Sequence, residues 1–255
     1  MSAKILIIDI ETAPAEVYTF GLRKQNIGIN QIKHHPYILC WAAKWLGNKN
    51  VMSGSLVDYP KYYAKDCRND ETLVKILWLL LDEADIVVGQ NGDAFDIKWI
   101  NELFLKHHKE LPSPYRTVDT LKVSRQTFFS ISHKLDYRTS KHGLGRKKEH
   151  EGFGLWVKCM DGDLDAWKRL IAYCKQDVKL LEDYYMLLRP YMKTHPNLNI
   201  YNETNMGCTA CGSMTLKKNG YRVTATGKYQ HYRCLNCGKS SQSNKGVSNE
   251  GEMLK

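Results

Sequence analysis

Two acidic residues stand one position apart at the end of an apolar run near the N-terminus. The run is ILII at residues 5–8, and Asp9 and Glu11 follow it on either side of Ile10. In a strand, residues i and i+2 point to the same face, so the two carboxylates would project side by side. Two close anions raise each other's pKa unless a cation lies between them. The pair therefore predicts a metal-binding strand end.

Two further aspartates lie where additional ligands could come from. Asp96 follows the strand-like stretch IVVGQ within NGDAFD, and Asp177 lies in YCKQD inside the last long helical stretch. Tyr173 precedes Asp177 by four positions, so their side chains share one helical face. Oxygen ligands of this kind suit Mg²⁺ or Mn²⁺ rather than zinc. Four such carboxylates can hold two ions about 4 Å apart, which suits in-line attack on a phosphodiester.

The acidic residues must be positioned by a sheet and helices, and the flanking sequence predicts both. Besides the first strand, the expected strands are residues 37–46, 49–56 and 84–89. The expected helical stretches are residues 73–84, opened by Asp70, residues 94–109, residues 118–128, and two stretches within residues 163–189. Asp119 is interpreted as a helix cap rather than a ligand. At 255 residues, the chain can form one substantial α/β domain and a small module.

The net charge of the chain indicates what kind of partner it binds. The formal net charge is +10 with 43% hydrophobic residues, which favours nucleic acid as a partner, followed by an anionic membrane surface. A basic protein without a polyanionic partner is the alternative. The N-terminal apolar run is too short for a signal peptide, and no stretch reaches the length of a spanning helix. We therefore expect a cytoplasmic protein with no membrane partner; the small size would suit a phage, mobile-element or bacterial protein.

Taken together, DIET, NGDAFD and YCKQD resemble the three motifs of the DEDD 3′→5′ exonuclease superfamily, which has a ribonuclease H-like fold. Tyr173 is similar to the tyrosine of the DEDDy subclass, which includes the exonuclease domain of family B DNA polymerases. The resemblance covers about residues 1–190. It implies an α/β fold with a mixed sheet flanked by helices. It also implies 3′→5′ hydrolysis of single-stranded nucleic acid, DNA ahead of RNA, with release of nucleoside 5′-monophosphates.

The resemblance implies a role for each motif residue. Asp9 would bridge two Mg²⁺ or Mn²⁺ ions, and Glu11 would contact one metal and the water or terminal nucleotide. Asp96 would hold the second metal, and Asp177 would complete the first site. Tyr173 would orient the attacking water. The other motif residues, expected to contact the terminal nucleotides, are Thr12, Asn91 and Phe95.

Structural roles stay open for several of these residues. Asp96 could cap a helix, and Tyr173 could be a core or interface residue. Asn91 and Phe95 could serve the loop alone. Asp93 lies closer to the turn than Asp96 and is interpreted as a turn residue.

A second constellation lies near the C-terminal end. Four cysteines form the pattern C-x2-C-x22-C-x2-C, and they are Cys208, Cys211, Cys234 and Cys237. Two such pairs can bind one tetrahedral Zn²⁺ through thiolates, which leaves no open position for chemistry, so the zinc would be structural. A redox dithiol pair is the alternative. The segment resembles a zinc ribbon, as found in some insertion-sequence transposases, and Asn219-Gly220 indicates a turn inside it.

Basic and aromatic residues are interleaved in the ribbon, a composition that suits phosphates and unpaired bases. The candidate nucleic-acid contacts are Lys217, Lys218, Tyr221, Arg222, Tyr229, Tyr232 and Arg233. Docking to a protein, for example a replication or repair protein, is the alternative.

The expected organisation has four parts. These are a nuclease domain over residues 1–190, a linker over 191–205, a zinc ribbon over 206–242 and a disordered tail over 243–255. A 3′→5′ exonuclease is the favoured function. An endonuclease of the same fold and a nucleic-acid-binding adaptor on a nuclease scaffold are the two rivals.

Overall fold

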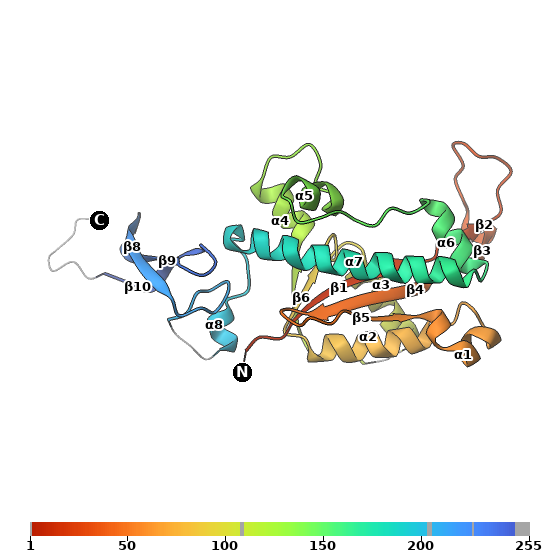
Figure 1. The fold of residues 1–255 in the computed structure, drawn as a ribbon, viewed down its shortest axis with the longest axis horizontal. Helices are drawn as coiled ribbons and strands as arrows, with labels where there is room; N and C mark the ends of the chain where they lie inside the picture. Colours follow the sequence, from red (N-terminus) through yellow and green to blue (C-terminus); the bar gives the residue numbers. More distant parts are fainter. Residues whose placement is uncertain (1, 108–109, 203–205, 226, 248–255) are drawn as a thin grey trace.

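A five-stranded mixed sheet forms the centre of the larger domain (Figure 1) in the computed structural model, which describes residues 2–107, 110–202, 206–225 and 227–247. In spatial order, its strands are β5 (Met52–Ser55), β4 (Ile38–Trp45), β1 (Ile5–Thr12), β6 (Ile86–Gly89) and β7 (Arg116–Asp119). β4 pairs antiparallel with β1 and β5, whereas β6 pairs parallel with β1 and β7. The expected α/β class with a mixed sheet is confirmed.

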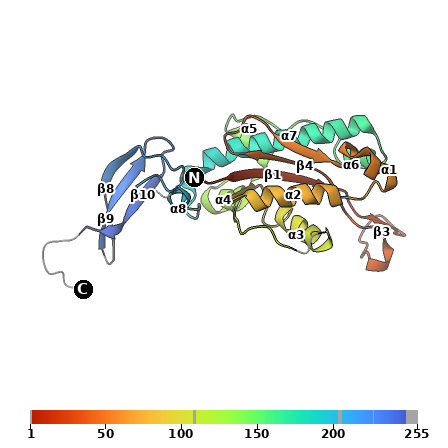
Figure 2. The same ribbon diagram turned by 90° about the horizontal axis from the view of Figure 1, so that it is seen from below.

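Helices cover both faces of this sheet. Figure 2 shows α5, α6 and α7 on one side and α2 and α3 on the other. The helices of the larger domain are α1 (Pro60–Lys65), α2 (Glu71–Glu83), α3 (Asp96–His107), α4 (Thr120–Thr127), α5 (Leu135–Lys141), α6 (Phe153–Met160) and α7 (Leu164–Leu188). Among the described helices, none combines the length and the apolar character needed to cross a membrane.

β1 lies at the middle of the sheet and is covered on both faces. Its residues Ile5, Leu6, Ile7 and Ile8 are each at most 4% exposed. A strand buried on both faces has a continuous apolar sequence rather than an alternating one, which explains the ILII run. Asp9 is therefore the first polar residue at the end of a fully buried strand.

α7 is one continuous helix of 25 residues, so the expectation of two helical stretches was wrong. The Asp163 carboxylate caps its first turn by accepting hydrogen bonds from the amides of Asp165 and Ala166. No glycine or proline occurs between Leu164 and Leu188, so nothing in the sequence interrupts the helix. The buried side of α7 packs on β1 and β4.

A buried polar network connects α7 to its helical neighbours. Arg138 on α5 donates through Nε to the hydroxyl of Tyr184 at 3.0 Å. That hydroxyl donates to Ser124 Oγ on α4 at 2.8 Å, and Ser124 Oγ lies 2.8 Å from His133 Nδ1. Because buried polar groups are costly without partners, this chain fixes the position of α7 along the sheet.

Other segments depart from the expectations. β7 occupies the start of the expected helix 118–128, and α4 follows it directly. Asp119 accepts hydrogen bonds from the amides of Leu121 and Lys122, so its interpretation as a helix cap is confirmed. The hairpin of β2 (Glu16–Val17) and β3 (Ile32–His34), together with α1 and α6, was not expected.

The smaller domain is a three-stranded antiparallel sheet beyond the C-terminal end of α7. Its strands are β8 (Leu216–Thr224), β9 (Gly227–Cys234) and β10 (Ser240–Gly246). Asn219-Gly220 does not form the hairpin turn; the β8–β9 register shifts there, and Gly220 takes a φ of +70° within a bulged strand.

Two expected boundaries differ from the structure. β10 continues to Gly246, so the ribbon does not end at residue 242 and residues 243–246 belong to a strand. The helix α8 (Leu198–Tyr201) lies within the expected linker. Residues 203–205 of that linker and residues 248–255 of the expected tail lie outside the described residues.

A nearly buried ion pair offers a test of how α7 is held on the sheet. Glu182 on α7 accepts from Lys44 Nζ on β4 and from the Gly47 amide at 3.0 Å, and both charged side chains are at most 13% exposed. Glu182→Ala should lower the free energy of unfolding by about 3 kcal/mol, because it leaves the Lys44 charge unpaired.

The measurement is urea unfolding followed by tryptophan fluorescence, because all six tryptophans lie between residues 41 and 167. The control is Asp183→Ala at the neighbouring exposed position, which should change the free energy by less than about 0.5 kcal/mol. Equal unfolding midpoints for the two variants would contradict this role of the pair.

Candidate active site and metal centres

Three carboxylates meet where β1 ends beside the middle of α7. One oxygen from each of Asp9, Glu11 and Asp177 lies within 4.8 Å of the others. Asp177 is 3% exposed, whereas Asp9 and Glu11 are half-buried. The structure thus brings together three acids that are far apart in the sequence.

The strand register explains how β1 presents its two acids. Asp9 pairs with Ala42 and Glu11 with Cys40, and both partners have small side chains. Cys174 on α7 lies close, with its Sγ 3.5 Å from Asp9 Oδ2. The β1–β4 register shifts between Glu11 and Thr12, and such irregularities re-aim side chains next to functional sites.

Asp96 lies beside this cluster but is not one of the three acids that meet. It is 4% exposed at the start of α3, and its Oδ1 accepts a hydrogen bond from the Ile10 amide at 3.1 Å. The β1–β6 ladder extends to Ile7 and Val88, so Asp96 supplies a partner to β1 beyond the end of β6. Its charge still reaches the cluster, because it contributes to the raised pKa of Asp9.

Lys147 enters the cluster from the loop between α5 and α6. Its Nζ donates to Asp177 Oδ2 and to the Tyr173 hydroxyl, the latter at 2.9 Å. The same ammonium lies 4.9 Å from the centre of the Tyr173 ring. A positive charge therefore offsets part of the negative charge of the acids.

The pKa values of the acids are raised mainly by removal from water, with neighbouring carboxylates adding to the effect for Asp9 and Glu11. Burial raises the pKa of Asp9 well above its ordinary value, and Glu11, Asp96 and Asp177 raise it further. Burial and Asp177 raise the pKa of Glu11 to about 8. Burial raises the pKa of Asp96 to about 7, opposed by its hydrogen bond from Ile10. Bound cations would reverse these shifts, because they favour the ionised carboxylates.

An aromatic groove of about 450 Å³ opens beside Glu11. Its lining residues are Glu11, Thr12, Pro14, Phe95, His150, Gly152, Phe153 and Trp156. Phe153 is 67% exposed, so its ring is accessible from solvent. Aromatic faces next to a phosphodiester-cleaving centre can stack on unpaired bases.

The other motif residues have separate positions. Thr12 and Phe95 line the groove. Tyr173 is 8% exposed, with its ring centre 4.8 Å from that of His150 and 6.2 Å from that of Trp156. Asn91 is not among the groove residues; it takes a φ of +66°, and its amide donates to Asp119 Oδ1 at 3.0 Å. Its observed contacts therefore serve the turn before α3.

The donor set fits a hard divalent cation. All three converging groups are carboxylates, and Asp177 Oδ1 is buried without a hydrogen-bond partner. Such an orphaned oxygen costs free energy unless something binds it. Mg²⁺ and Mn²⁺ prefer oxygen ligands, so the cluster could hold either.

The four cysteines of the ribbon form a second candidate metal centre. Their sulfur atoms all lie within 4.8 Å of one another, and both the Cys208–Cys237 and Cys211–Cys234 separations are 3.6 Å. A tetrahedral site with Zn–S bonds of about 2.3 Å requires sulfur separations of about 3.8 Å. The arrangement therefore fits zinc.

The two cysteine loops share one backbone geometry. The Gly212 amide donates to the Cys208 carbonyl at 2.8 Å, and the Gly238 amide donates to the Cys234 carbonyl at 3.0 Å. Both glycines have a positive φ, of +72° and +76°, which a residue with a side chain rarely adopts.

The candidate nucleic-acid contacts of the ribbon divide between its two faces. In-register pairs put Lys217 with Arg233 and Arg222 with Tyr229 on one face. The pairing of Lys218 with Tyr232, and of Tyr221 with Gln230, forms the other face. The ribbon therefore presents basic and aromatic groups on both sides rather than on one surface.

The fold and the acid cluster together define an α/β protein with a candidate cation-binding active site. A comparison with protein-family models supports this fold: the model of the RNase_H superfamily matches residues 45–189, which is more than half of the chain. The chain therefore belongs to the RNase H superfamily. The matched segment begins after β1, so it includes Asp96 and Asp177 but not Asp9 or Glu11. The search of curated proteins gave no match.

Membership in this superfamily supports a nuclease-type hydrolase that acts on nucleic acid. Sequence reasoning missed three residues at the site, His150, Phe153 and Trp156, and it did not single out Lys147. Phe153 and Trp156 are three positions apart, which places them on one side of a helix. That spacing was a usable signal, but α6 itself was not recognised. Lys147 belongs to a basic run whose individual members cannot be told apart by sequence.

The raised carboxyl pKa values predict that metal binding depends on pH. Glu11, with a pKa of about 8, must lose its proton before it can bind a cation. Mn²⁺ affinity should therefore rise between about pH 6 and about pH 8, by up to about tenfold per pH unit for each proton released.

Titration calorimetry in two buffers of different ionisation enthalpy would measure both affinity and proton release. Asp93→Asn is the control, because Asp93 lies in a turn and pairs with Lys122 at 2.7 Å. A pH-independent affinity without proton release would contradict the assignment of these acids as ligands.

A second prediction concerns the ribbon, whose buried cluster contains little besides Cys208, Ala210 and Cys234. So small a core cannot hold a fold alone, so metal binding should supply much of its stability. Cys234→Ser should abolish stoichiometric zinc, measured by elemental analysis, and make the ribbon susceptible to proteolysis. Cys67→Ser, outside the cluster, should keep one zinc per chain. Full zinc content in Cys234→Ser would refute the four-cysteine site.

Proposed function

We propose that this protein is a metal-dependent 3′→5′ exonuclease of the DEDDy type that acts on single-stranded nucleic acid. The observation that carries the proposal is the convergence of Asp9, Glu11 and Asp177 beside an aromatic groove. Carboxylates alone would suit many cation sites. A groove that can receive unpaired bases next to them favours a strand end as the substrate.

The acids would hold the divalent cations. Asp9, Glu11 and Asp177 are the proposed ligands of one ion, and Asp96, buried beside Asp9, is a proposed ligand of the second. When bound, the ions would lower the pKa of the attacking water and stabilise the leaving 3′ oxygen. Hydrolysis forms a new P–O bond to water and breaks the bond to that 3′ oxygen, which releases a nucleoside 5′-monophosphate.

Tyr173 is proposed to orient the attacking water. Burial raises the pKa of Tyr173 well above its ordinary value, so the hydroxyl keeps its proton at neutral pH. Lys147 donates to the oxygen of this hydroxyl at 2.9 Å, so the hydroxyl is held beside Asp177 at the proposed metal site. Lys147 thereby acts as a positioning residue.

The groove is proposed to bind the terminal nucleotides. Phe95, Phe153 and Trp156 offer ring faces for stacking, and Thr12 lies at the end of β1 against the same groove. Stacking contributes about 1–3 kcal/mol per base and tolerates any sequence. DNA is the first substrate because the motifs resemble the exonuclease domain of family B DNA polymerases, and RNA is the second.

The ribbon is proposed to bind one structural zinc and to hold the strand near the active site. Its basic and aromatic residues support nucleic-acid binding. Tethering a second binding module raises the effective concentration of substrate at the first.

The test is a time course on 5′-labelled single-stranded DNA and matched RNA with Mg²⁺ or Mn²⁺. The parent protein should give a descending ladder of products. Asp177→Asn should reduce the rate by about 10³-fold or more, equivalent to about 4 kcal/mol of transition-state stabilisation. Asp93→Asn should keep the parent rate.

A circular single strand distinguishes the rival functions. An exonuclease leaves the circle intact, whereas an endonuclease of the same fold would cut it. Binding of linear strands without turnover in either metal would instead leave a nucleic-acid-binding adaptor. A loss in Asp93→Asn equal to that in Asp177→Asn would refute the assigned acid cluster.

A further inference from the structure

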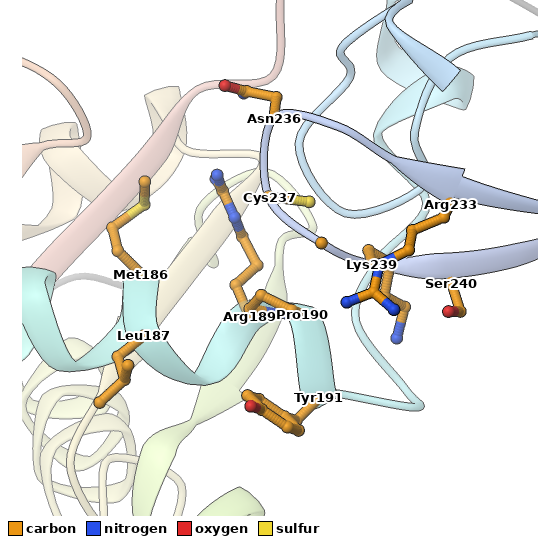
Figure 3. Close-up of a pocket in the computed structure, with 11 residues that line it drawn as sticks. Met186, Leu187, Arg189, Pro190, Tyr191, Arg233, Asn236, Cys237, Lys239 and Ser240 are labelled. Atoms are coloured by element: carbon orange, nitrogen blue, oxygen red, sulfur yellow. The ribbon is translucent and has the colours of Figure 1, made fainter. Parts of the chain in front are cut away.

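A cavity of about 670 Å³ separates the end of α7 from the second cysteine loop of the ribbon. Figure 3 shows Arg189 extending from the end of α7 toward the loop that carries Asn236 and Cys237. Arg233 and Lys239 lie on the ribbon side of the same cavity. Residues from both domains therefore build this space.

Arg189 is the most informative lining residue. It is 6% exposed, and its Nε is buried without a hydrogen-bond partner. The guanidinium carbon lies 5.8 Å from the centre of the Tyr185 ring, so an aromatic face supports the group. Tyr185 contacts this guanidinium, but no carboxylate among the described lining residues balances its charge, so the unpaired positive charge favours an anion in the cavity.

The other charged groups around the cavity have the same sign. Arg233 is exposed on β9, and Lys239 Nζ donates to the Met192 carbonyl, a contact between the ribbon and the segment after α7. Among the described residues that line the cavity, none is an aspartate or glutamate. Three cations without a facing carboxylate attract an anion.

The surroundings favour a phosphate group on a strand. Arg233 pairs in register with Lys217 on the basic face of the ribbon, so the positive surface continues outward from the cavity. Arg189 follows Asp177 by twelve residues on nearly continuous helix, a rise of about 18 Å. A strand of several nucleotides could span that distance, because each stacked nucleotide advances about 3.4 Å.

We propose that this cavity binds a backbone phosphate of the nucleic-acid strand, with Arg189, Arg233 and Lys239 as its ligands. The inference rests on the proposed function in taking the bound strand to be the substrate. It adds a contact, at the junction of the two domains, that anchors the strand on the 5′ side of the end to be cleaved.

Neutralisation of the metal centre is the competing role for these cations. Four thiolates around one Zn²⁺ carry a net charge of −2, and Cys237 lines the cavity. If balancing that charge were the whole role of Arg189, its removal would change zinc binding rather than strand binding. Zinc content therefore has to be measured beside affinity.

The experiment uses the full chain carrying Asp177→Asn, so that the strand survives the measurement. Fluorescence anisotropy follows binding of a labelled single-stranded DNA of about 20 nucleotides between about 50 and about 200 mM salt. Arg189→Gln should weaken binding by about tenfold at the lowest salt. It should also reduce the slope of log K against log salt by about 0.7, the value for one lost phosphate contact on a single strand.

Two further variants keep the test decisive. Lys239→Gln should lower affinity and slope in the same direction, and it carries the test if Arg189→Gln does not fold. Lys75→Gln is the charge-matched control, because Lys75 pairs with Glu71 on α2, on the opposite side of the sheet from α7. It should change affinity less than twofold.

Unchanged affinity and slope in both junction variants would overturn the proposal. Loss of zinc in Arg189→Gln, together with normal strand binding by Lys239→Gln, would also overturn it. Arg189 would then serve to balance the charge of the zinc site. Titration with inorganic phosphate at constant ionic strength tests whether the cavity binds the free ion instead of a strand. Arg189-dependent binding of that ion without any effect on the strand would also overturn it. Because no turnover is needed, an inactive parent would refute the proposed nuclease function without affecting this measurement.

Discussion

Three carboxylates lie within 4.8 Å of one another at the end of a buried strand, and the fold must hold them there against their mutual repulsion. Like charges at that distance repel strongly in a site of low dielectric constant. Lys147 offsets part of the charge, and Asp177 Oδ1 remains without a hydrogen-bond partner. The cluster is costly for stability unless cations bind it, and retention of such strain is typical of a functional site rather than of a core.

The surrounding fold is what makes this arrangement durable. β1 is buried on both faces, so it cannot slide without exposing its isoleucines. α7 is fixed by the Glu182–Lys44 pair and by the Arg138–Tyr184 network. The same helix continues to the ribbon, where Arg189 lines the junction cavity. α7 thus carries an acid of the proposed active site near its middle, and the cation proposed to bind the strand lies just past its end.

Sequence patterns predicted the main strands because each has a strong local signal, such as the buried run before Asp9. The boundaries of the long helices and of the ribbon strands were harder to predict. The continuity of α7 was missed because polar residues interrupt its apolar pattern, although the absence of glycine and proline between Leu164 and Leu188 was a usable signal. Asn219-Gly220 has the composition of a hairpin turn but lies in a bulge, because β8 continues past it to Thr224 and pairs there with Gly227. Lys147 lies in a run of similar residues, and tertiary contacts alone single it out.

A crystal structure with Mn²⁺ and a short single strand, recorded to show anomalous scattering, would locate both the cation and the strand end. We expect a manganese peak bounded by Asp9, Glu11 and Asp177, with Lys147 moved away from Asp177 and the 3′ end of the strand in the groove of Phe95 and Trp156. A cluster without a manganese peak, still closed by Lys147 while the strand lies elsewhere, would contradict this expectation.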